Sequence, residues 1–138
     1  MDETWTILLV DDEPDICNAL RRSLRVPGYS VLIAHDGAQA LEFLSTQHVD
    51  AIISDYNMPG MDGLDLLQHV RIMKPQILRI LLTARGDLPL AVRALNEGGV
   101  HRLLLKPWDH VDLRGTLELA LHSMNTRPTS ACFAALAK

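Results

Sequence analysis

The chain has 138 residues, of which 48% are hydrophobic and 22% charged, and this composition is typical of one globular domain. Its formal net charge of −4 offers no basic stripe for a nucleic-acid backbone, so we expect no direct contact with nucleic acid. No apolar stretch approaches the length of a membrane span, and we expect no membrane association. The two cysteines, Cys17 and Cys132, have no metal-ligand spacing and predict a reducing, cytoplasmic location.

Short apolar runs alternate with longer segments in which apolar residues recur at helical spacing. The runs are rich in Val, Ile and Leu with little alternation, as in strands that are covered on both faces. In chain order they cover residues 5–10, 30–34, 51–54, 78–82 and 102–105. These five runs are predicted to be five buried parallel strands.

Helix-start and helix-end signals support these boundaries. Pro14 suits the first turn of the first helix, and Asp36, Asp62 and Asp109 are predicted N-caps of later helices. Pro89 can open a fourth helix over residues 90–97, and the glycine pair that follows would end it. The fifth helix is predicted over residues 111–124.

Five strand–helix units in strict alternation predict an α/β domain with a parallel sheet covered by helices on both faces. The commonest five-stranded arrangement is the flavodoxin-like (βα)5 three-layer sandwich, with strand order 2-1-3-4-5. We expect this domain to occupy residues 4–125. Residues 126–138 begin with linker composition and are expected to be a C-terminal linker or tail. Ligands in such a sheet bind at the carboxyl ends of strands 1 and 3.

Acidic side chains follow these two strands. Asp11 and Asp12 come directly after the first run, and Asp55 ends the third. Because neighbouring parallel strands end at one edge of the sheet, the three carboxylates should meet there and repel one another strongly. Capping of the next helix accounts for Asp12 alone but not for all three acids. The pattern therefore predicts a divalent cation among them.

Two further strand ends carry a hydroxyl and a cation. Thr83 and Ala84 follow the fourth run, and Lys106 follows the fifth. The four motifs, in this order and at the ends of alternating strands, resemble the receiver domain of two-component response regulators over residues 5–124. The resemblance implies that Asp55 accepts a phosphoryl group from a sensor histidine kinase or a phosphotransfer protein. It also implies a signalling domain, not an enzyme that acts on external substrates.

The resemblance implies a metal site at the acids. Asp12, Asp55 and the backbone carbonyl of Asn57 would ligate Mg²⁺, or Mn²⁺ in its place, with Asp11 acting through bound water. A hard cation of this kind suits a few carboxylates with positions left open for phosphate and water.

The resemblance also implies how the phosphoryl group is held. Lys106 would pair first with the Asp55 carboxylate and then with a phosphoryl oxygen, and family precedent implies a cis Lys106-Pro107 bond. The Thr83 hydroxyl and the Ala84 backbone N–H would bind other phosphoryl oxygens. Phosphoryl transfer needs an in-line nucleophile and charge neutralisation on these oxygens, and little else from a protein.

One position departs from the family pattern. Most receivers have an aromatic residue three positions before the lysine, where this chain has Leu103. We hypothesise that the readout passes through repacking of Leu103 against the fourth helix, or through Trp108. Asn57 and Arg85 are expected to tune the phosphoryl lifetime, and Arg85→Ala is expected to change the dephosphorylation rate.

The family signals through the face built from the fourth helix, the fifth strand and the fifth helix, which implies a homodimer, an output domain or a partner protein there. Two alternatives stay open at this point. A degenerate receiver would dock without phosphorylation, although the intact acids, Thr83 and Lys106 argue against it. A haloacid-dehalogenase-like phosphatase would place an Asp-x-Asp pair after its first strand, where this chain has Asp11 and Asp12 followed by Glu13.

Overall fold

A computed structural model describes residues 4–124. The elements in chain order are β1 (Trp5–Val10), α1 (Pro14–Ser23), β2 (Tyr29–Ala34), α2 (Gly37–Thr46), β3 (Ala51–Asp55), α3 (Gly63–Met73), β4 (Leu78–Thr83), the 3-10 turn η1 (Arg85–Asp87), α4 (Leu88–Asn96), β5 (Arg102–Leu105) and α5 (His110–Ser123). The predicted tail, residues 126–138, lies outside the described residues.

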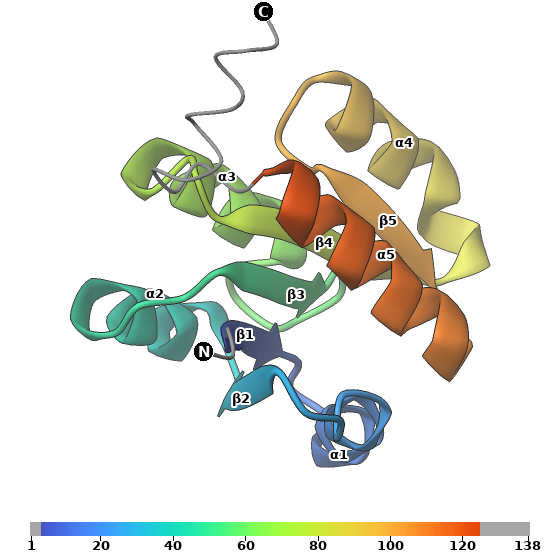
Figure 1. The fold of residues 1–138 in the computed structure, drawn as a ribbon. Coiled ribbons are helices and arrows are strands. Elements are labelled where there is room, and N and C mark those ends of the chain that lie inside the picture. The colour runs from blue at the N-terminus through green and yellow to red at the C-terminus, as the bar shows by residue number, and fades with distance from the viewer. Residues whose placement is uncertain (1–3, 125–138) are drawn as a thin grey trace, which may run out of the picture.

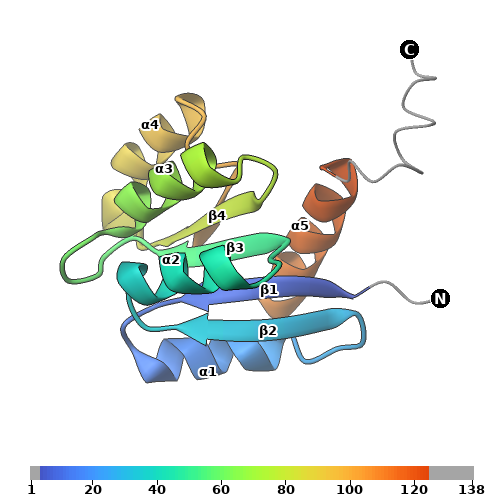
Figure 2. The ribbon, with the colours of Figure 1, turned by 90° about the vertical axis from the view of Figure 1, so that its left-hand side faces the viewer.

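The five strands form one sheet with the order β2-β1-β3-β4-β5, and every neighbouring pair is parallel. This confirms the predicted flavodoxin-like sandwich. Helices α1 and α5 cover one face of the sheet, and α2, α3 and α4 cover the other (Figures 1 and 2). Successive β1 residues serve opposite faces, because Ile7 and Leu9 pack under α1 and α5, while Leu8 and Val10 pack under the other three helices.

The predicted caps are confirmed. The carboxylates of Asp36, Asp62 and Asp109 each accept a hydrogen bond from a backbone N–H of the third residue of the helix that follows. Within the described residues, no helix is both long and apolar enough to cross a bilayer.

The fourth helix begins earlier than predicted. It starts at Leu88, with Pro89 in its first turn, and it follows η1 directly. Pro89 suits a helix start, since proline is tolerated where the backbone N–H has no intrahelical partner. Sequence pattern did not reveal η1, because three residues carry no periodicity. The helix ends at Asn96, and Gly98 adopts a φ of 87° just beyond it, as predicted for a glycine that terminates a helix.

Candidate functional site

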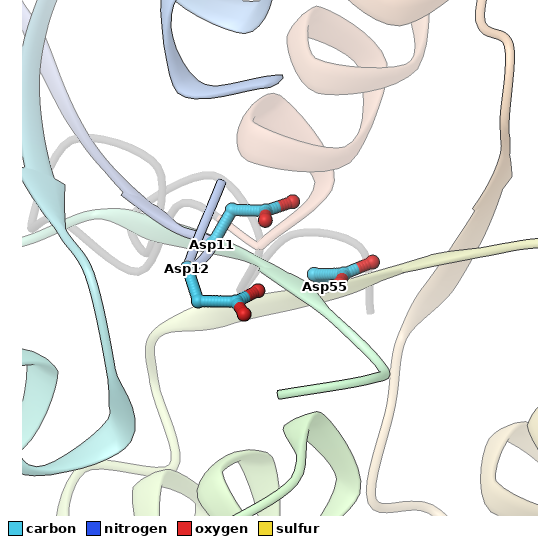
Figure 3. A group of neighbouring side chains, drawn as sticks. All are labelled: Asp11, Asp12 and Asp55. Carbon is cyan, nitrogen blue, oxygen red and sulfur yellow. The ribbon is translucent and has the colours of Figure 1, made fainter. Parts of the chain in front are cut away.

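The first and third strands deliver the acids to one edge of the sheet. Val10 lies beside Ser54 in the β1–β3 pairing, so Asp11, the next residue, and Asp55, the last residue of β3, end side by side. Figure 3 shows the carboxylates of Asp11, Asp12 and Asp55 gathered there. One carboxylate oxygen from each lies within 4.8 Å of the others. The structure therefore brings together the three acids that the sequence placed at two separate strand ends.

Asp11 is the most buried of the three acids. It has no exposed surface, and its Oδ1 accepts the Glu13 backbone N–H at 2.9 Å. Its Oδ2 has no hydrogen-bond partner among residues 4–124. Burial, with a smaller contribution from the negative charge of Asp55, raises the pKa of Asp11 to about 6. A buried oxygen without a partner is destabilising unless something else satisfies it, and a hard divalent cation with its bound water fits this set of oxygens.

Lys106 follows β5. In the sheet order, β5 and β1 lie on opposite sides of β3, so Lys106 approaches Asp55 from the side opposite to Asp11 and Asp12. Its Nζ is 2.6 Å from Asp55 Oδ1, and the Asp55 side chain is only 6% exposed. Burial alone would lower the pKa of Lys106, but its hydrogen bond to Asp55 and the other nearby carboxylates raise it above its ordinary value. Lys106 therefore stays protonated beside Asp55.

The β3–α3 and β4–α4 loops border the same carboxylate. The Thr83 side chain is buried, and its hydroxyl donates to the Ala84 carbonyl at 3.2 Å. The Asn57 side-chain amide donates to the Asp87 carboxylate at 2.9 Å and so joins the two loops. Ala84 and Arg85 are exposed at the start of the second loop.

Comparison with known proteins decides the family. Residues 7–118 match the response regulator receiver domain. The chain belongs to this family. It is 39% identical over 115 residues to the transcriptional regulatory protein ZraR of Escherichia coli K12, a match that covers 83% of this chain and 26% of ZraR. It is 35% identical over 125 residues to the response regulator MprA of Mycobacterium bovis, covering 91% of this chain and 53% of MprA.

Solved structures agree with this assignment. The signal receiver domain of an HD domain-containing protein from Pseudomonas fluorescens is 39% identical, with a TM-score of 0.82 over 88% of this chain and 98% of that one. The receiver domain described here spans about a quarter of the length of ZraR. Receiver domains bind Mg²⁺ at an acidic pocket, and the three clustered carboxylates provide such a pocket.

Two features of this receiver domain bear on its departure from the family pattern. Leu103 is half-buried and packs against the cluster that contains Ala91 and Ala94 of α4. Trp108 packs against the opposite cluster, under α1 and α5, and its Nε1–H donates to Ser23 Oγ at 2.8 Å. The Lys106-Pro107 bond is cis, as predicted.

Three residues near the site were not found from the sequence. Gly63 opens α3 so close to Asp55 that a Cβ atom there would lie 2.1 Å from the Asp55 carbonyl oxygen. Ser23 and Asp87 bind the site loops from positions 85 and 30 residues away along the chain from their partners Trp108 and Asn57. No local sequence signal marks such contacts, because they arise only when the sheet has formed.

Proposed function

We propose that Asp55 is the phosphoacceptor of this receiver domain. The donor is a phosphohistidine on a sensor histidine kinase or a phosphotransfer protein. An Asp55 carboxylate oxygen attacks phosphorus, the phosphorus–nitrogen bond breaks, and its electron pair leaves with the imidazole. The observation that carries this proposal is the pairing of Asp55 with Lys106 at 2.6 Å inside a cluster of two further acids. Lys106, and the cation when the acid site is filled, offset the negative charge that Asp55 and the two neighbouring acids bring together.

In this proposal Asp12, Asp55 and the Asn57 carbonyl would ligate Mg²⁺ or Mn²⁺, and Asp11 would act through bound water. The ion, when bound, supplies positive charge to the phosphoryl oxygens. Lys106 supplies a second cation on the other side of the carboxylate. The Thr83 hydroxyl turns from the Ala84 carbonyl to a phosphoryl oxygen, and the Ala84 N–H binds a third oxygen.

The output of the domain is proposed to be a change on the face formed by α4, β5 and α5, where a second copy, an output domain or a partner protein binds. The negative charge of the phosphoryl group and the hydrogen bonds that it forms would shift the equilibrium of this face between two arrangements. Four apolar side chains on α4 and α5 are exposed and support this proposal: Leu90, Val92, Val111 and Leu119. Figure 1 shows β5 at the sheet edge with α4 and α5 beside it. The receiver unit is proposed to occupy residues 4–125 in the cytoplasm.

Incubation with acetyl phosphate and Mg²⁺, followed by intact mass measurement, tests the proposal. We expect the wild-type chain to gain the mass of one phosphoryl group and Asp55→Asn to gain none. Asp65→Asn, which alters an exposed acid of α3, is the matched control and should gain the group as the wild type does. Equal phosphorylation of Asp55→Asn would refute the assignment, and no phosphorylation of the wild type would favour docking without phosphorylation.

A further inference from the structure

Ser23, in the last turn of α1, connects that helix to the chain segment that follows Lys106. Its side chain is buried, with 1% exposure. Its Oγ lies 3.2 Å from the Ala19 carbonyl, 2.8 Å from Trp108 Nε1 and 2.5 Å from His110 Nδ1. Its backbone carbonyl accepts from Arg114 Nη1 at 2.9 Å. Three of these four partners therefore lie within the β5–α5 connection and the first turns of α5.

The number of hydrogen atoms limits the directions that these bonds can take. A serine hydroxyl has one hydrogen to donate and two lone pairs to accept with. The Ala19 carbonyl can only accept, and the Trp108 indole N–H can only donate. Ser23 therefore accepts from the Trp108 N–H, and its single hydrogen goes to the Ala19 carbonyl or, when His110 Nδ1 carries no hydrogen, to that nitrogen. In either case an alanine here would leave the Trp108 N–H without its acceptor and would break the contact with His110.

This arrangement bears on the position of the Lys106 ammonium. Lys106 has a long, flexible side chain, so its backbone must be held for Nζ to stay 2.6 Å from Asp55. Trp108 follows two residues later, and its ring packs against the core cluster beneath α1 and α5. Helix α1 begins at Pro14, just after Asp11 and Asp12. The helix thus links the acidic loop at its N-terminus to the lysine-bearing loop at its C-terminus.

We propose that Ser23 is a positioning residue for phosphoryl transfer, which holds the Lys106 loop through Trp108 and His110. This inference rests on the proposed function of Asp55 and Lys106. A serine that only closed its own helix would need the Ala19 carbonyl and nothing more. The two additional bonds join Ser23 to the loop that carries the lysine, and they place the lysine relative to the acids.

The test compares rates of phosphorylation by acetyl phosphate at saturating Mg²⁺ for the full chain and its variants. Ser23→Ala is expected to slow the reaction by roughly tenfold, because small misplacements of a reacting group reduce rates by such factors. Its Mg²⁺ affinity should stay within about twofold of the wild type, because the hydroxyl does not contact the acids. Ser123→Ala removes a hydroxyl that, among residues 4–124, bonds only the Ala120 carbonyl of α5, and this control should react as the wild type does.

Epistasis separates positioning from general stability. In a Lys106→Ala background, Ser23→Ala should cause no further loss of rate, because the group that it positions is absent. Trp108→Phe removes the indole N–H and some aromatic surface but keeps a ring in the core cluster, so it should also slow the reaction in the wild-type background, even if Ser23→Ala does not fold. Unchanged rates in Ser23→Ala or, failing its folding, in Trp108→Phe would overturn the proposal, as would an equal loss in the Lys106→Ala background. If the wild type takes no phosphoryl group, the proposed function fails and the positioning role fails with it.

Discussion

The Asn57 amide donates a hydrogen bond to the Asp87 carboxylate across 2.9 Å, and this contact joins the loop after Asp55 to the turn before α4. The first loop carries the backbone carbonyl proposed as a metal ligand. The second begins at Ala84, whose N–H is proposed to bind the phosphoryl group. A single side-chain contact thus holds together two parts of the site that come from different strands.

Asp87→Ala should therefore weaken Mg²⁺ binding. An exposed side-chain hydrogen bond contributes about 1 kcal/mol, which corresponds to roughly a fivefold change in affinity. The affinity is measured by titration with Mg²⁺ in a calorimeter. Asp87→Asn is the matched control, because its amide oxygen can still accept from Asn57 while the charge is gone. If both variants weakened binding equally, the charge of Asp87 and not its hydrogen bond would be responsible.

Removal of the Lys106 ammonium should separate metal binding from phosphoryl transfer. Lys106→Met takes a positive charge from the acid cluster, so Mg²⁺ should bind more tightly. Phosphorylation by acetyl phosphate should slow by about 10²–10³-fold, the usual effect of deleting one group that stabilises transition-state charge. Arg93→Met, on an exposed face of α4, should change neither quantity. An undiminished phosphorylation rate in Lys106→Met would remove the lysine from the mechanism.

Gly63→Ala should damage both the fold and the site. The added Cβ would lie 2.1 Å from the Asp55 carbonyl oxygen and 3.0 Å from the Tyr56 Cα, and both are backbone atoms that cannot move alone. We expect a loss of about 1–3 kcal/mol in the free energy of unfolding, measured by chemical denaturation, as for other overpacked positions. An alanine Cβ at Gly115, in α5, would meet no atom of the other described elements within 4 Å, so Gly115→Ala should instead stabilise by about 0.5–1 kcal/mol. A Gly63→Ala variant as stable as the wild type would contradict this packing.

The His101 imidazole should make stability depend on pH. Its Nδ1 accepts the Arg79 backbone N–H at 2.9 Å, and burial, with help from the charges of Arg79 and Arg102, lowers the pKa of His101 from 6.5 to about 4. As the pH falls, His101 therefore binds a proton near pH 6.5 in the unfolded chain but only near pH 4 in the folded chain. Stability from this group is complete above pH 6.5 and is lost as the pH falls towards 4.

His101→Asn provides the comparison, because its amide oxygen can accept from Arg79 and does not titrate. Free energies of unfolding measured from pH 7 downwards should fall less steeply in this variant. The difference between the two profiles isolates His101 from Asp11, whose pKa of about 6 lies in the same range. Profiles that stayed parallel across this window would contradict the lowered pKa.

The local pattern of residue types along the sequence was sufficient to predict much of the fold. Continuous apolar runs identified the five strands, and the caps Asp36, Asp62 and Asp109 were recognised because an N-cap bonds only residues next to it in sequence. The meeting of Asp11 with Asp55 could also be predicted, because strand order in an alternating α/β chain has few solutions.

Contacts between distant segments could not be predicted in the same way. Arg79 looks like an interruption of an apolar strand, yet it is 4% exposed and its guanidinium donates to backbone carbonyls that include Pro75 and Gly99. Ser23 reads as one more residue on a helix face, and its bonds to Trp108 and His110 depend on how α5 returns across the sheet. Such partners are set by tertiary packing, which leaves no periodic trace in the sequence.

Peptide-level mass spectrometry after reaction with acetyl phosphate locates the modified residue and so tests whether Asp55 is the phosphoacceptor. We expect a phosphoryl group on the peptide that contains Asp55 in the presence of Mg²⁺, and none when a chelator removes the ion. A phosphoryl group on any other residue, or an equal yield at Asp55 without a divalent cation, would contradict this expectation.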